Sequence, residues 1–216
     1  MIRFLSIVIP GNVRKLHMWL GWDTKCDLDA SAILMGQDGR VHDVVFYGNK
    51  QSKCNGLIHM GDNLTGEGDG DDETILIDLD KIHPSVFCVV FTVNVFTAGK
   101  SFADVEGEFC RLVDESNYEI CRYNTLDNGS HNAALFCALF RDMSKPDWWK
   151  MVAVGQWGHG RVARDLVPAA QGYMYRIPGS TAAAPRTPPP QPIRPVQPPQ
   201  QHQPQQKKPK KSCEVM

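Results

Sequence analysis

The chain has 216 residues and a formal net charge of −1, and its length suits one well-buried domain with an appendage. The charge is uneven: from Ile177 onward the net charge is +5, which leaves −6 on the preceding body. No apolar run approaches the roughly 18 residues of a membrane-spanning helix. The seven cysteines include no C-x-x-C pair, which excludes the usual zinc motif and favours reduced thiols in a cytoplasmic protein. No nucleic-acid partner is predicted.

The first half of the chain reads as short apolar runs separated by turn residues. The opening "MIRFLSIVIPG" predicts a first strand. Asp38 and Gly39, between two apolar segments, predict a hairpin, because Asp-Gly suits a tight β-turn. "TILIDL" alternates in polarity and "SVFCVVFTVNVF" is β-branched and aromatic, so both predict strands.

The second half continues in the same way. "CRLVDESNYEICRYN" predicts another hairpin that turns at residues 115–117, and "AALFCALF" and "WWKMVAVG" predict a last strand pair. The stretch from Ser101 to Phe109 is the one convincing helix candidate, and it is short. Strands at this spacing without intervening helices predict a mainly β fold for residues 1–176, an antiparallel two-sheet β-sandwich with one or two short helices.

Residues 177–216 differ in composition from the body. Proline and glutamine dominate, apolar periodicity is missing, and this predicts a disordered, largely polyproline II tail. "PRTP" and "PIRP" fit the P-x-x-P pattern that SH3-type modules bind, although such matches are frequent in proline-rich tracts.

The last four residues, Cys213 to Met216, match a C-a-a-X box whose methionine favours farnesylation of Cys213. Stable attachment to an anionic membrane needs a second signal, which the lysines upstream would supply: Lys207, Lys208, Lys210 and Lys211. The tail therefore predicts a peripheral location at a cytoplasmic membrane face. The alternatives are a chance cysteine and, for "KKPKK", a nuclear address.

The stretch "GDNLTGEGDGDDE", residues 61–73, holds six carboxylates interleaved with glycine. In an extended chain alternate residues point the same way, so Glu67, Asp69, Asp71 and Glu73 would form one row of oxygens. An Asp-x-Asp pair in "CDLDAS" repeats the arrangement. Many oxygen ligands on a glycine-rich loop are typical of calcium sites, which take six to eight oxygens. The alternative is a solvated acidic loop.

Five motifs in chain order carry a resemblance to a known family: "LGWD", "DLDAS", "VFYGN", "GDNLTGEGDGDDE" and "AVGQ". Together they resemble the tellurium-resistance TerD-like family over most of residues 1–176. The resemblance implies a β-sandwich that binds calcium in acidic loops, found in bacterial stress operons and in a cyclic-AMP-binding protein of similar sequence. Position by position, it implicates as metal ligands Asp27, Asp29, Asp62, Asn63, Glu67, Asp69, Asp71, Asp72 and Glu73.

The functional prediction is a non-enzymatic calcium-binding protein that acts as a sensor or adaptor in a stress or signalling pathway. The seven histidines are scattered, and neither G-x-S-x-G nor a recognisable Cys–His nucleophile signature is present. Two alternatives stay open. One is a metal-dependent hydrolase of the phosphoesterase type, and the other is a cyclic-nucleotide-binding module, which rests on the family resemblance alone.

Overall fold

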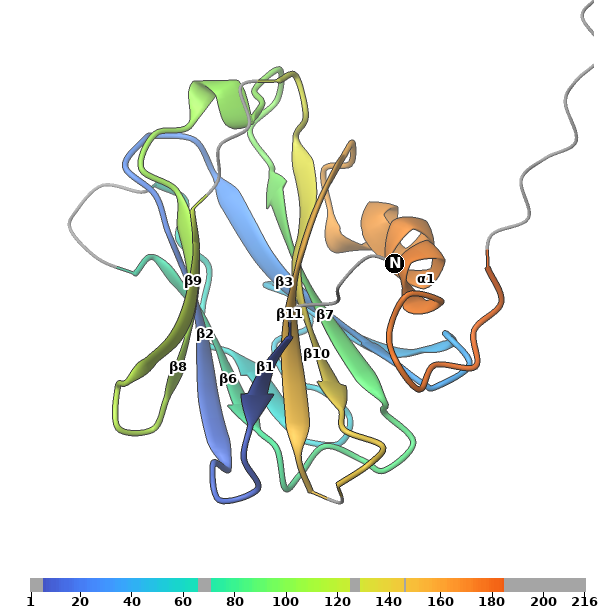
Figure 1. The fold of residues 1–216 in the computed structure, drawn as a ribbon. Helices are drawn as coiled ribbons and strands as arrows, with labels where there is room; N and C mark the ends of the chain where they lie inside the picture. The colour runs from blue at the N-terminus through green and yellow to red at the C-terminus, as the bar shows by residue number, and fades with distance from the viewer. Residues whose placement is uncertain (1–5, 66–70, 125–128, 146, 185–216) are drawn as a thin grey trace, which may run out of the picture. The chain divides into compact units, whose positions relative to one another are not determined.

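Two antiparallel β-sheets stacked face to face form the body of the protein (Figure 1). The structure is a computed structural model that describes residues 6–65, 71–124, 129–145 and 147–184. The six-stranded sheet has the order β1 (Ser6–Ile9), β11 (Trp149–Gly158), β10 (Ala133–Arg141), β7 (Cys88–Val95), β3 (Leu28–Met35) and β4 (Val41–Val45). The five-stranded sheet has the order β5 (Leu57–His59), β6 (Glu73–Asp78), β2 (Lys15–Gly21), β8 (Phe109–Asp114) and β9 (Glu119–Asn124).

The main core lies between the two sheets and follows from alternation along the strands. In β3, Leu28, Ala30 and Leu34 face this inner core together with β7 residues such as Phe91. The five-stranded sheet contributes alternate residues of β2 and β8, among them Leu16 and Leu112. The predicted two-sheet sandwich is therefore confirmed.

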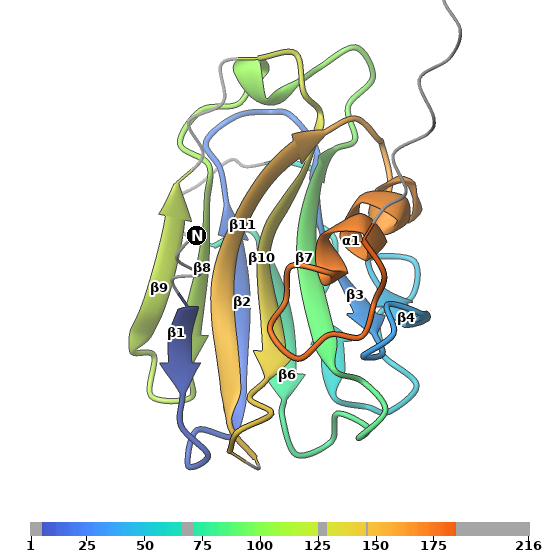
Figure 2. The ribbon, with the colours of Figure 1, turned by 45° about the vertical axis from the view of Figure 1, so that its right-hand side comes forward.

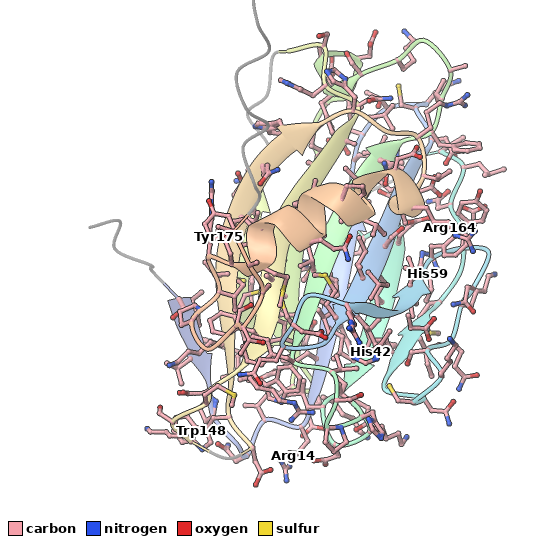
Figure 3. All side chains as sticks on the ribbon, turned by 90° about the vertical axis from the view of Figure 1, so that its right-hand side faces the viewer. Arg14, His42, His59, Trp148, Arg164 and Tyr175 are labelled. Carbon is pink, nitrogen blue, oxygen red and sulfur yellow. The ribbon has the colours of Figure 1, made fainter. Side chains whose placement is uncertain are left out.

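A second core covers the outer face of the six-stranded sheet. The 3₁₀ turn η2 (Ala163–Leu166) leads into α1 (Val167–Met174), which lies across this face in Figures 2 and 3. Apolar residues recur at helical spacing along this segment and pack against the outward-facing side chains of β3, β7 and β10: Leu166, Ala170, Tyr173, Met174 and Ile177. Figure 3 looks onto α1, with Arg164 beyond one end and Tyr175 at the other.

Most of the predicted strands and both hairpins are confirmed. The first hairpin joins β3 to β4 through Gly39, whose φ of 79° suits glycine. The second joins β8 to β9 through Asn117 at a φ of 66°, a left-handed conformation that asparagine tolerates. β2 and β5 were not predicted.

The helix prediction for residues 101–109 is wrong. The structure has only the 3₁₀ turn η1 (Phe102–Asp104), and Phe109 already begins β8. Gly107 adopts a φ of 68°, which ends any helical path before that strand. The α1 helix was missed, because it has only eight residues, contains Gly172 and is stabilised mainly by packing. None of the helices within the described residues has the length and apolar run needed to span a membrane.

The described body continues beyond the predicted boundary at residue 176. Ile177 is buried in the outer core, and the Thr181 N–H donates to the carbonyl of Gln37 over 2.8 Å. Residues 177–184 therefore belong to the sandwich domain. The rest of the predicted tail, with Cys213 and the four lysines, lies outside the described residues.

The packing of α1 in the outer core predicts that shortening one of its buried side chains lowers the stability of the protein. Met174→Ala should lower the free energy of unfolding by about 2–5 kcal/mol, because Met174 is fully buried and the substitution leaves a cavity. Tyr175→Ala is the matched control at the next residue, which is 40% exposed, and should change stability by less than about 0.5 kcal/mol. Urea denaturation of both variants measures this, and equal effects would contradict the assigned helix face.

Candidate metal site

Three aspartates from two separate segments meet at one end of the sandwich. Asp27 immediately precedes β3, Asp29 lies within β3, and Asp62 belongs to the connection between β5 and β6. One carboxylate oxygen of each lies within 4.8 Å of the others. At an effective dielectric constant of about 20, two unit charges about 5 Å apart repel by about 3 kcal/mol. The cluster therefore favours either protonation or a bound cation.

Two oxygens of this cluster are buried without a hydrogen bond. Asp29 is only 3% exposed, and within the described residues its Oδ2 has no partner; the same holds for Oδ1 of Asp27. Buried polar atoms are almost always satisfied, because leaving one unpaired costs free energy. An oxygen-coordinated cation would satisfy both atoms at once.

The pKa values of the two β3 aspartates reflect this environment. Burial, followed by the negative charges of Glu73, Asp27 and Asp62, raises the pKa of Asp29 from 3.8 to about 8. Burial, followed by Asp62 and Glu73, raises the pKa of Asp27 to about 6. Negative charge at this site is thus poorly compensated by the protein itself.

Glu73 is buried beside the cluster, but its oxygens already have partners. Its Oε2 accepts a hydrogen bond of 2.6 Å from the Ala30 N–H and lies 3.6 Å from His59 Nε2. The Gly61 N–H donates to His59 Nδ1, which assigns the proton of a neutral ring to Nε2. Burial is the largest influence on Glu73 and raises its pKa. Glu73 therefore acts mainly to join β6 to β3.

Asp72 and Asn63 shape the connection that carries Asp62. Asp72 Oδ2 accepts from the Trp22 N–H, and its Oδ1 accepts from Asn63 Nδ2, each over 2.9 Å. The Asn63 N–H reaches Glu73 Oε1 at 3.4 Å, and its side-chain oxygen accepts from Thr65. These contacts hold the connection against the sandwich at the position from which Asp62 reaches β3.

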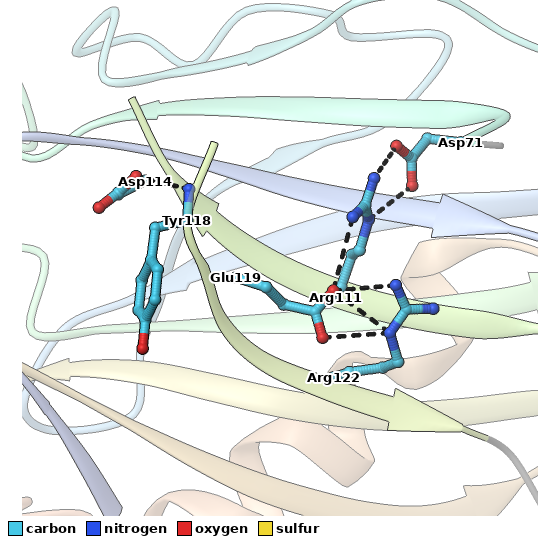
Figure 4. Close-up of polar contacts among 6 residues, drawn as sticks. All are labelled: Asp71, Arg111, Asp114, Tyr118, Glu119 and Arg122. Carbon is cyan, nitrogen blue, oxygen red and sulfur yellow. Dashed lines mark hydrogen bonds and ion pairs between the residues drawn. The ribbon is translucent and has the colours of Figure 1, made fainter. Parts of the chain in front are cut away.

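Asp71 turns away from the cluster toward the outer face of the five-stranded sheet. Figure 4 shows its carboxylate paired with Arg111, which donates from Nε over 3.0 Å and from Nη2 over 2.6 Å. Arg111 also pairs with Glu119 and lies 4.2 Å above the ring of Trp19. Asp71 and Glu73 therefore have different partners and do not form one row. Glu67 and Asp69 lie outside the described residues.

Sequence reasoning missed three polar residues next to Asp29. In the register of β3 and β7, Asp29 pairs with Asn94, and Ser31 pairs with Thr92. All are buried, and Ser31 Oγ, Thr92 Oγ1 and Asn94 Oδ1 have no hydrogen-bond partner within the described residues. Alternation places them on the same face as Asp29. The available signal was the asparagine in "VFTVNVF", since an amide in a buried strand needs a partner.

The matching sequence relatives share most of this domain. The TerD domain model matches residues 9–167. A tellurium resistance protein TerZ from Serratia marcescens is 38% identical over 70% of this chain and 84% of its own length. A stress response protein SCP2 from Bacillus subtilis is 35% identical over 72% of this chain and 89% of its own length.

Solved structures agree with the fold. The crystal structure of a homologue of the telluride resistance protein TerD from Streptomyces coelicolor matches with a TM-score of 0.60 and 20% identity, over 72% of this chain and 95% of that chain. At that identity the likeness bears on the fold alone. The family match and the identities to the sequence relatives together show that this chain belongs to the TerD domain family.

Proposed function

We propose that this TerD-family domain binds calcium through Asp27, Asp29 and Asp62, and acts in a stress response without catalysing a reaction. The observation that carries the proposal is the buried, unpartnered Oδ2 of Asp29 beside two further carboxylates. Calcium suits this site because it takes many oxygen ligands in flexible geometry. The relatives named as tellurium resistance and stress response proteins support the cellular setting.

The remaining acidic residues divide into two groups in this proposal. Glu67 and Asp69 would complete the coordination, because they belong to the same connection as Asp62 in the sequence, whereas the side-chain oxygen of Asn63 already accepts from Thr65. The carboxylates of Asp71, Asp72 and Glu73 already accept hydrogen bonds, so these groups position the connection instead.

A sensor or adaptor role follows from the charge change on binding. A divalent cation would neutralise most of the three negative charges and draw the Asp62 connection toward β3. Because Asn63 contacts both Asp72 and Glu73, this connection is coupled to the start of β6 and, through Glu73, to β3 of the other sheet. A partner surface there would change with calcium, as in other ligand switches.

We also propose that the tail holds the domain at the cytoplasmic face of a membrane. A farnesyl group on Cys213 would give reversible binding, and Lys207, Lys208, Lys210 and Lys211 would add attraction to anionic lipid. The P-x-x-P segments would allow an SH3-type partner to dock beside the domain.

Calcium should stabilise the protein through the three aspartates. At a calcium concentration 100 times the dissociation constant, the gain is about 2.7 kcal/mol, or roughly 5–10 °C in the melting temperature for a domain of this size. Asp29→Asn should abolish this rise without lowering the melting temperature of the metal-free protein, since asparagine is neutral and removes a buried carboxyl that must otherwise be protonated or compensated. Differential scanning fluorimetry of chelator-stripped protein measures both effects.

Two matched variants sharpen that test. Asp80→Asn alters an acid beyond the far end of β6 and should leave the calcium response intact. Asp71→Asn should also retain most of the response, because Arg111 already holds that carboxylate. A full calcium response in Asp29→Asn, or an equal loss in Asp80→Asn, would refute the assigned site.

The pH dependence of stability should differ between wild type and Asp29→Asn. The folded-state pKa of Asp29, about 8, exceeds its ordinary value of 3.8, so the folded protein binds this proton more tightly than the unfolded chain. Metal-free wild type should therefore lose stability relative to Asp29→Asn as the pH rises from 3.8 toward about 8. With calcium the trend should reverse, because binding requires the ionised carboxylate. Urea denaturation across that pH window checks the sign, and parallel curves for the two proteins would contradict it.

The tail proposal has a direct chemical test. Incubating the full chain with protein farnesyltransferase and farnesyl diphosphate should add one farnesyl group, detected by mass spectrometry. Cys213→Ser should abolish the addition, whereas Cys54→Ser, which removes a half-buried thiol of the body, should not. An unmodified wild-type chain, or modification that persists in Cys213→Ser, would rule out the C-a-a-X assignment.

A further inference from the structure

Five sulfur atoms gather around one cavity between the two sheets. The cavity has a volume of about 360 Å³, and five different strands contribute its sulfur-bearing lining residues: Met18, Cys110, Cys121, Cys137 and Met151. The lining also includes Ile7 and Arg122, which are exposed, so the cavity reaches the surface. That opening lies where the edge strands β1 and β9 run along the same side of the sandwich (Figures 1 and 2).

Three of the sulfurs are in close contact. The Cys110 thiol donates to Met18 Sδ over 3.0 Å. Cys110 also lies beside Cys137, and this contact raises the pKa of the Cys137 thiol. These residues lie on β2, β8 and β10, so strands from both sheets bring the sulfurs together. All six cysteines of the described part of the chain are free thiols.

Ordinary core packing does not account for this arrangement. Buried cysteine and methionine often act as hydrophobic filler, but filler leaves few voids larger than a water molecule. Cys88 shows the contrast, because it is fully buried in the outer core and does not line this cavity.

A nucleophilic or redox role for these cysteines does not agree with their surroundings either. The contact with Cys110 and burial raise the pKa of Cys137, and burial raises that of Cys121 to about 11, so neither thiol is a ready nucleophile in the absence of a metal ion.

The chemistry of the lining selects a class of ligand. The side chains that the described residues place around the cavity include no carboxylate and no histidine. Calcium, magnesium and zinc sites therefore do not fit, whereas thiolate and thioether ligands select soft ions such as Cu(I).

We propose that this cavity is a binding site for a soft monovalent metal ion of the Cu(I) class, held by Cys110, Cys137 and Met18. Binding forms two copper–thiolate bonds and one copper–thioether bond. The two thiol protons pass to solvent, and copper stays in the Cu(I) state, so no oxidant or reductant is consumed. Cys121 and Met151 also line the cavity. This site shares no residue with the aspartate cluster and does not depend on the calcium proposal.

The test is an anaerobic titration of Cu(I), buffered by a competing chelator such as bicinchoninate, into the reduced full chain without calcium. Wild type should bind one Cu(I) per chain and develop the ultraviolet charge-transfer band of copper–thiolate bonds. Cys137→Ser should weaken binding by at least about 100-fold, judging from the losses seen when metal sites are altered. No stoichiometric uptake by wild type would overturn the proposal.

Three further variants separate the site from alternatives. Cys88→Ser and Cys213→Ser remove a buried thiol elsewhere and the tail thiol, and both should keep wild-type affinity and the same absorption band. Met18→Leu conserves volume, so it should fold even if Cys137→Ser does not, and it should lower affinity by about 10-fold. Unchanged affinity in Met18→Leu and Cys137→Ser, or loss in Cys213→Ser, would overturn the assignment.

Discussion

The hydrogen bond between the Ala30 N–H and the buried carboxylate of Glu73 joins the two sheets at the acidic end of the sandwich. Glu73 begins β6 in one sheet, and Ala30 lies in β3 of the other, next to Asp29. The same carboxylate accepts a hydrogen bond from the Asn63 N–H, and Asn63 follows Asp62 directly in the chain. Glu73 therefore links the two segments that carry the three aspartates. Its negative charge also raises the pKa of Asp29, so the contact that closes the sandwich makes the site harder to ionise without a cation.

Local patterns were enough to predict the sandwich and two of the three aspartates that the structure brings together. Alternation and turn residues gave the hairpins, and the Asp-x-Asp pair pointed to Asp27 and Asp29. The pairing of Asp71 with Arg111 joins residues 40 positions apart, which no local pattern predicts. The α1 helix was not predicted for a related reason. Its stability depends on packing against the outer face of a sheet whose strands are distant in sequence. Contacts between residues distant in sequence thus determine which of the described acidic residues have carboxylate oxygens without a hydrogen-bond partner.

The proposed oxygen ligands and the proposed sulfur ligands occupy different parts of the same sandwich. The aspartates lie at one end of β3, with Asp29 on the outer side of its sheet, whereas the sulfur cavity lies between the sheets. Hard and soft ions differ in the donor atoms they prefer, so each group would discriminate against the ions suited to the other. Because β2 carries Met18 and leads to Trp22, which binds Asp72, one strand runs past both regions.

The stacking of Arg111 on Trp19 has an optical consequence. The guanidinium lies 4.2 Å above the indole ring, so a positive charge sits directly on a natural fluorophore. Arg111 is also held by Asp71, at the end of the acidic connection. Any displacement of that connection that pulls on Asp71 would shift the charge above the indole and alter the emission of Trp19. The domain thus contains an intrinsic fluorescent reporter beside its acidic segment, and the state of that segment can be followed without an attached dye.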